Sequence, residues 1–286
     1  MKKFIVGILS GALLVFLLAG TAGAQVRFGF RTYGGLSYLS TGDVNKGVES
    51  WSDFYKIIYL HDYTTSDKYK PLNLGLDFGG ELLIQFSPQF ALGLGSGYIT
   101  ASKNFEMNFR KLGELPVTYT SETKMGAIPI RLSLYYFLAV GPGISVSLHA
   151  GTGYYLANLD FLQRIETSAG FEEIRFDTKG GGLGFHGGFG LEIALSSMIS
   201  LVFDLTGRFA SFSNFTGDQT IAVSGFSLTE RDLNVYFLKI NEWPYGTFSL
   251  LYLNDTTPSG PEIISADRAK VSFSGFSSFI GFLFRF

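Results

Sequence analysis

Charged and imidazole side chains recur at alternate positions within several apolar segments of this chain. Alternate residues of an extended strand share one face, so these side chains are expected to gather on one side of a sheet. Carboxylates, guanidinium groups and histidines held together can serve acid–base or nucleophilic catalysis, or bind a metal. The set comprises Arg27, Arg31, Asp77, Glu81, Arg131, His149, His186, Glu192, Asp204 and Arg208, with Arg285 near the C-terminus.

The small number of histidines limits which catalytic mechanisms the chain could use. A histidine-dependent hydrolase or acyltransferase mechanism would have to use His61, His149 or His186. Ser147 lies two residues from His149 on the same face, a poor geometry for a nucleophile and its base. No G-x-S-x-G motif is present, and the absence of cysteine excludes thiolate chemistry. A metal held by His149, His186 and Glu192 is an alternative. A polar network that fills the inside of a barrel explains the set better, so we predict no catalytic residue, no metal and no cofactor.

Eight segments alternate apolar and polar residues with a period of two, which is typical of strands. Three tight turns, near Ser87, Gly141 and Ser197, alternate with four polar loops, a pattern typical of outer-membrane barrels with short periplasmic turns and long extracellular loops. The strands are 26–39, 72–86, 90–100, 124–138, 144–156, 182–195, 199–209 and 271–286, and the loops are 40–71, 101–122, 158–179 and 211–270.

Turn positions also predict which lumenal residues face one another. A turn symmetric about Ser197 places Arg208 opposite His186 and Asp204 opposite Gly190. A turn centred on Gly141 places His149 opposite Ser133.

The N-terminus has the layout of an export signal. Lys2 and Lys3 precede an apolar run over 4–19, and Ala22-Gly23-Ala24 offers the small residues of a cleavage site. We predict a cleaved Sec-type signal peptide, 1–24, followed by one domain, 25–286. A retained membrane anchor is the alternative, for which the apolar run is short.

Composition favours a membrane barrel over other all-β folds. Hydrophobic residues make up 46% of the 286 residues and charged residues 16%, against about 25% charged residues in soluble domains. A net charge of −2 gives no support to nucleic-acid binding. In the competing fold, a soluble lipocalin-like barrel or β-sandwich, the polar face would be exposed, yet that face is rich in glycine and poor in lysine.

The last segment, VSFSGFSSFIGFLFRF, places four apolar residues on one face: Ile280, Phe282, Phe284 and Phe286. It resembles the C-terminal signature of bacterial outer-membrane β-barrel proteins, and the segment AIPIRL at 127–132 is similar to a strand opening of small OmpA/OmpX-like barrels. The eight alternating segments together with this resemblance predict an all-β, eight-stranded antiparallel up-and-down transmembrane barrel among outer-membrane lipids. The resemblance also implies that the barrel assembly machinery recognises the last strand.

Two further segments could add a hairpin, 233–240 and 247–254, joined through Trp243-Pro244. Ten strands would result if the hairpin crossed the membrane, but each half is shorter than the ~9–11 residues required. We therefore expect it to extend outside the membrane. Trp51 and Trp243 lie in the predicted loops, where aromatic residues either form a surface for an extracellular ligand or pack together and order the loop.

Our leading functional prediction is a non-enzymatic outer-membrane barrel that anchors long surface loops for envelope structure or surface interaction. A small-solute pore is the first alternative, because a set of glycines leaves the predicted lumen without side chains. A lipid-modifying enzyme that depends on His149 or His186 is the second. The glycines are Gly93, Gly95, Gly97, Gly184, Gly188 and Gly190.

Overall fold

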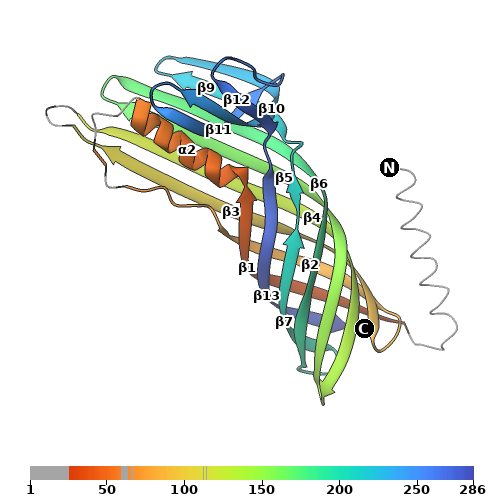
Figure 1. Cartoon of the computed structure of the whole chain (residues 1–286). Coiled ribbons are helices and arrows are strands. Elements are labelled where there is room, and N and C mark those ends of the chain that lie inside the picture. The colour runs from red at the N-terminus through yellow and green to blue at the C-terminus, as the bar shows by residue number, and fades with distance from the viewer. Residues whose placement is uncertain (1–25, 59–63, 66, 112, 114) are drawn as a thin grey trace.

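Eight antiparallel strands close into a ring in this computed structural model, which describes residues 26–58, 64–65, 67–111, 113 and 115–286 (Figure 1). The last of these strands pairs with the first, Gly29 opposite Arg285, and this pairing closes the ring. The predicted eight-stranded up-and-down fold is confirmed. The ring strands are β1 (Arg27–Gly42), β2 (Leu74–Gln85), β3 (Phe90–Phe109), β4 (Val117–Gly141), β5 (Ile144–Thr167), β6 (Gly170–Ala194), β7 (Ile199–Phe209) and β13 (Val271–Arg285).

The two faces of the ring differ in polarity, because successive residues of each strand point to opposite faces. Leu36 and Leu74 point outward and are 65% and 71% exposed, whereas Ser37 and Asp77 point inward and are fully buried. In water such an apolar outer surface would aggregate, but it suits the hydrocarbon of a bilayer. Along the last strand, Ile280, Phe282 and Phe286 are exposed on this surface, and Phe284 is half-buried.

Four strands continue well beyond the ring, over segments predicted to be loops. The predicted loops 101–122 and 158–179 are wrong, since β3 extends to Phe109, β4 begins at Val117, and only two residues join β5 to β6. Apolar and polar residues still alternate in these extensions, but the apolar residues now occupy the inward-facing positions instead of the outward-facing ones. Leu148, Tyr154 and Leu156 of β5 point outward at even positions, whereas Ala157, Leu159 and Phe161 are buried at odd positions.

This inversion has a physical cause. Within the membrane the outer face contacts lipid and the inner face is polar. Beyond the membrane the outer face contacts water, and the inner face is covered by protein. The same inversion occurs in β3, where Leu94 points outward and Phe105 and Phe109 are buried. We therefore expect the membrane surface to lie near the point of inversion on these extended strands.

The predicted loop 40–71 contains a helix, α2 (Asp43–Ile58). Val44, Val48, Trp51 and Tyr55 recur at the spacing of one helical face and pack into the two apolar clusters beyond the ring. The helix was missed because its short apolar stripe lies among polar residues. No helix in the described residues has the length and apolarity to cross a bilayer.

The predicted loop 211–270 is also largely folded. Its elements are β8 (Ser211–Phe212), β9 (Thr216–Val223), β10 (Phe226–Glu242), β11 (Gly246–Asn254) and β12 (Ile263–Arg268). β9 pairs with the outer part of β6, and β10 pairs with β9, β11 and β12. The predicted hairpin is confirmed as β10 and β11, and it lies outside the ring.

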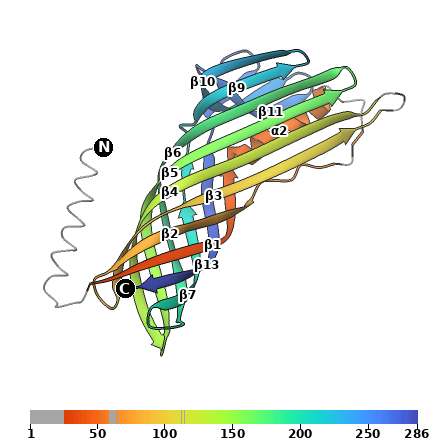
Figure 2. The ribbon, with the colours of Figure 1, turned by 180° about the vertical axis from the view of Figure 1, so that it is seen from behind.

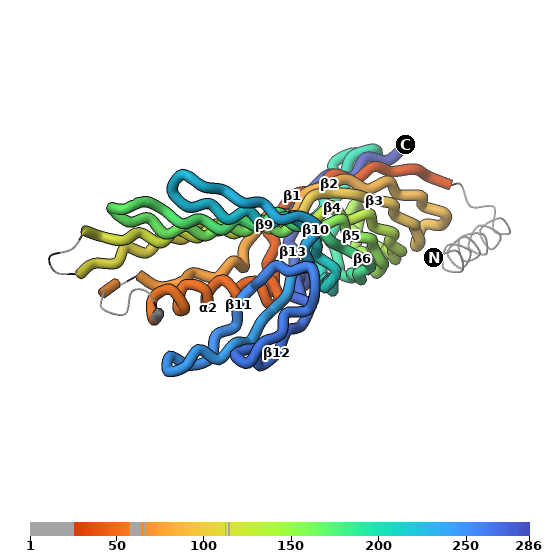
Figure 3. Tube along the Cα trace, turned by 90° about the horizontal axis from the view of Figure 1, so that it is seen from above, coloured from red at the N-terminus to blue at the C-terminus, as the bar shows by residue number. Residues whose placement is uncertain are grey.

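Together α2 and β11 form a second layer over the inner face of the extended sheet (Figures 1 and 2). From above, the extended strands and α2 project to one side of the barrel (Figure 3). The helix also protects the edge of β11. Trp51 Nε1 donates to Leu251 O at 2.9 Å, and Ser50 Oγ accepts from Ser249 N at 2.8 Å. We call α2, β9–β12 and the extended parts of β3–β6 the outer layer.

We expect Leu251→Ala to loosen the outer layer while the ring stays folded. Leu251 is fully buried against α2, and removing a buried leucine costs about 2–5 kcal/mol. Protease should cleave the variant faster within 43–71 and 211–270, while the heat-dependent gel shift of the barrel persists. Tyr252→Ala, at the exposed neighbouring position, should behave like the wild type. Equal protease resistance of both variants would contradict a packed outer layer.

Candidate functional site

The polar face of the ring strands brings eight of the predicted residues together in the lumen. Each comes from the inward-facing positions of its strand, and all are buried. They carry three guanidinium groups and three carboxylates, so the charges balance when both imidazoles are neutral. The eight are Arg31, Asp77, Glu81, Arg131, His149, His186, Asp204 and Arg208.

Asp77 is the hub of one half of this network. Arg208 Nη1 and Arg131 Nη2 donate to its two carboxylate oxygens at 2.9 and 3.1 Å, and Ser277 Oγ donates at 3.2 Å. Arg208 Nη2 also donates to Ser37 Oγ at 2.9 Å. Each of these contacts joins two strands that are not neighbours in the ring: β7, β4 and β13 each with β2, and β7 with β1.

Arg31 is the centre of the other half. Its guanidinium group lies 3.3 Å from both Glu81 and Asp204. Tyr135 Oη donates to Glu81 at 2.6 Å, and Thr206 Oγ1 donates to Asp204 at 2.6 Å. Every carboxylate in the lumen is therefore paired and hydrogen-bonded, as buried charge requires.

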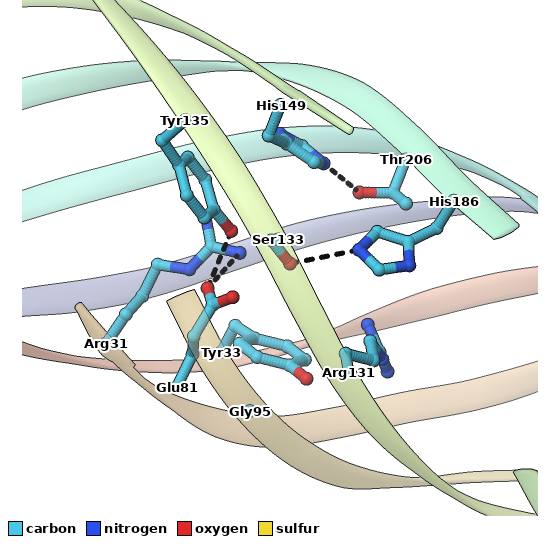
Figure 4. Close-up of a pocket in the computed structure, with 10 residues that line it drawn as sticks. All are labelled: Arg31, Tyr33, Glu81, Gly95, Arg131, Ser133, Tyr135, His149, His186 and Thr206. Atoms are coloured by element: carbon cyan, nitrogen blue, oxygen red, sulfur yellow. Dashed lines mark hydrogen bonds and ion pairs between the residues drawn. The ribbon is translucent and has the colours of Figure 1, made fainter. Parts of the chain in front are cut away.

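The two histidines bridge to hydroxyl groups (Figure 4). His186 Nε2 lies 3.0 Å from Ser133 Oγ, and His149 Nε2 lies 3.1 Å from Thr206 Oγ1. His149 Nδ1 lies 3.6 Å from Asp204 Oδ2. Ser133 and His186 are thus close enough together to act as a nucleophile and its base. His186 Nδ1, however, has no hydrogen-bond partner that would orient the ring.

The predicted strand register is confirmed at one turn and wrong at the other. His186 faces Arg208, and Gly190 faces Asp204. His149 faces Tyr135 instead of Ser133, because Gly141 pairs with Ile144 and leaves Pro142-Gly143 as a two-residue turn. Gly143 adopts a positive φ of 72°, which the turn requires. This shift is why Ser133 contacts His186, which lies two strands away.

Three predicted residues lie apart from the network, at the end of the barrel with short turns. Arg285 of β13 pairs with Glu192 of β6 across the intervening β7, and it also donates to Ser200 at 3.1 Å. Arg27 is exposed at this mouth, so the structure does not bring it into the network.

Side chains occupy the space that the lumenal glycines leave. A Cβ at Gly93 would lie 2.9 Å from the ring of Tyr135, and one at Gly184 would lie 2.8 Å from the ring of Tyr155. The cavity among the network residues has a volume of about 10 Å³, close to the minimum for one water molecule.

Apolar side chains lie beyond the network at both ends. On one side they belong to the apolar cluster shared with the outer layer, which includes Tyr155, Phe212 and Phe273. On the other side they form a smaller cluster that includes Leu83, Val202 and Leu283. Among the described residues, no group of three or more side chains is placed to hold a metal ion.

Sequence reasoning identified the charged residues of the network but missed the neutral residues that complete it. Ser37, Tyr135, Thr206 and Ser277 all supply hydrogen bonds to its charged members. Each lies on the inward face of its strand, so the period of two could have found them.

We expect Asp77→Asn to destabilise the barrel strongly. The substitution keeps the side-chain shape but leaves Arg131 and Arg208 buried without their carboxylate, and breaking a buried pair costs about 3–5 kcal/mol. Urea unfolding of the folded barrel, followed by its gel mobility, should show the loss. Asp267→Asn, at an exposed position of β12, is the matched control. Equal midpoints for the two variants would refute the hub role of Asp77.

Comparison with known proteins identifies the family. The profile of the outer membrane protein beta-barrel domain matches residues 10–229. The crystal structure of the outer membrane protein OprG from Pseudomonas aeruginosa is similar at 11% identity, with a TM-score of 0.41, over 92% of this chain and 98% of that one. No curated protein matches the chain. Because the profile spans most of the chain and the ring has an apolar outer face, the protein belongs to the outer membrane protein beta-barrel domain family.

Proposed function

We propose that this protein is a non-conducting, non-enzymatic outer-membrane barrel that anchors a folded outer layer for surface interaction. The observation that carries the proposal is the filled lumen. A buried network with equal numbers of guanidinium groups and carboxylates lies between two apolar clusters, and the cavity within it has a volume of about 10 Å³. An eight-stranded barrel is just wide enough for its side chains to fill it. The filled lumen argues against the first alternative, a small-solute pore.

The outer layer supports the second half of the proposal. It has its own apolar core, which includes Val48, Phe161 and Leu251, so it is a folded surface rather than a set of loose loops. Trp51 is part of that packing, whereas Trp243 is 86% exposed at the tip of the β10–β11 hairpin. In the proposed orientation the outer layer faces the outside and the three short turns face the periplasm.

The proposal also includes the route of export and assembly. Residues 1–24, the predicted cleaved signal peptide, lie outside the described residues. The proposed partner during insertion is the barrel assembly machinery, which would recognise the terminal strand through Ile280, Phe282, Phe284 and Phe286.

Burial argues against the enzymatic alternative. Ser133 is 2% exposed and His186 is 7% exposed, both within the filled lumen. A lipid substrate would have no access to this pair from the bilayer, because the apolar wall of the ring separates them. We therefore assign Ser133 and His186 to the polar filling of the barrel.

Planar-bilayer recording tests the closed lumen. The refolded mature chain, with insertion confirmed by its heat-dependent gel shift, should give no discrete conductance steps. A silent barrel that has inserted would agree with the filled lumen. Reproducible single-channel steps from the inserted protein would overturn the non-conducting assignment and favour the pore.

Site-directed labelling tests the orientation, because the chain has no cysteine of its own. Trp243→Cys places a thiol on the exposed hairpin tip, and Ser197→Cys places one in a short turn. A membrane-impermeant maleimide should label Trp243→Cys on intact cells and label Ser197→Cys only after the envelope is permeabilised. The reverse pattern would show that the outer layer faces the periplasm.

A further inference from the structure

One outward-facing surface of the barrel continues from the lipid zone into the outer layer without interruption. On β5, the lipid-facing residues Tyr154 and Leu156 are followed on the same face by Asn158, Asp160 and Leu162. Asp160 lies four residues beyond Leu156, about 13 Å along the strand. A molecule lying on this face would pass from hydrocarbon into the polar region directly above it.

The polar part of this surface is hollowed. A groove of about 520 Å³ opens there, over the extended parts of β3, β4, β5 and β6. Strand register places the outward-facing part of its lining in two adjacent rows: Ser102, Lys124, Asp160 and Asp177 in one, and Asn104, Glu122, Leu162 and Arg175 in the next. The buried residues Thr123, Phe161 and Phe176 complete the lining.

The groove presents hydrogen-bond acceptors and donors side by side. Asp160 and Asp177 face each other across the β5–β6 pair, an arrangement of like charges that is unfavourable without nearby donors. Asn158 Nδ2 supplies one of them, to Asp160 Oδ2 at 3.3 Å. Burial, together with Asp177, raises the pKa of Asp160 above its usual range. Lys124 and Arg175 supply cationic donors at neighbouring positions. Hydroxyl groups both donate and accept, so a hydroxyl-rich ligand could satisfy both kinds of side chain.

We propose that this groove binds the sugar head group of a glycolipid in the outer leaflet, with the acyl chains lying on the apolar face directly below. The acyl chains would contact Ile128, Tyr154, Leu156 and Leu183, which are 44–52% exposed. Head group and acyl chains then occupy one continuous surface of β4, β5 and β6. The proposal names a partner for the surface role above, and it rests on the proposed orientation.

Binding of defined lipids by the refolded full mature chain in detergent tests this proposal. The probes are a lipopolysaccharide truncated to its inner sugars, the oligosaccharide released from it, and phosphatidylglycerol, each measured by native mass spectrometry. The truncated lipopolysaccharide should bind at least tenfold more tightly than either other probe, because only it offers sugars and acyl chains together. Equal binding of phosphatidylglycerol would overturn the assignment of a sugar site.

Two groove variants test whether the lipid binds in the groove. Asn104→Trp fills the groove from an exposed position of β3, and Glu122→Gln with Asp177→Asn replaces two carboxylates by amides. Each should weaken lipopolysaccharide binding at least tenfold. The matched controls, Ser227→Trp on β10 and the pair Glu262→Gln with Asp267→Asn near β12, should bind as the wild type does. Wild-type binding by both groove variants would overturn the proposal.

Folding and orientation are read separately from binding. The heat-dependent gel shift verifies that each variant is folded, and the charge variant serves if the tryptophan variant fails to fold. Conductance and cysteine labelling use no glycolipid. A silent, correctly oriented barrel that ignores lipopolysaccharide would therefore eliminate this inference alone and leave the proposed function standing.

Discussion

Charge enclosed away from water has to be neutralised by other side chains, and this requirement organises the lumen. Arg31, Arg131 and Arg208 balance Asp77, Glu81 and Asp204. Three of these four ion pairs link strands that are not neighbours; the exception is Arg31 with Glu81, on the adjacent strands β1 and β2. Backbone hydrogen bonds hold each strand only to the two beside it. The side-chain network therefore fixes the cross-section of the ring while it fills the interior, so neutralisation and closure depend on the same residues.

The outer surface depends on a different constraint, the change from lipid to water along a single strand. Leu148, Tyr154 and Leu156 of β5 point outward, whereas Ala157, Leu159 and Phe161, farther along the strand, point inward. Both parts of the strand alternate with a period of two. The surroundings of the outer face, lipid or water, decide whether its residues are apolar or polar. The surface that covers hydrocarbon is therefore continuous with the surface that holds the polar groove, which allows one amphipathic molecule to contact both.

The ring could be predicted from the sequence because lipid imposes a clear alternation on segments such as 144–156. The members of the lumenal network could be predicted by face, but their pairing could not. The turn at Ser197 is symmetric, whereas the turn after Gly141 is displaced, and the displacement moves His149 away from Ser133. The outer layer was missed because its polar outward residues mask the buried ones, and α2 was missed because only four residues form its apolar stripe.

Helix α2 and its partner strand lie far apart in the sequence. Trp51 donates to the backbone of Leu251, 200 residues later. Because the chain is synthesised from its N-terminus, α2 exists before β11, so the apolar stripe of α2 has no cover until β11 follows. Contacts of such long sequence separation also form slowly, because the intervening chain has to be closed into a loop. The ring has to wait longer still, because β1 pairs with β13. The outer layer and the ring therefore both complete their cores only when the C-terminal strands are present.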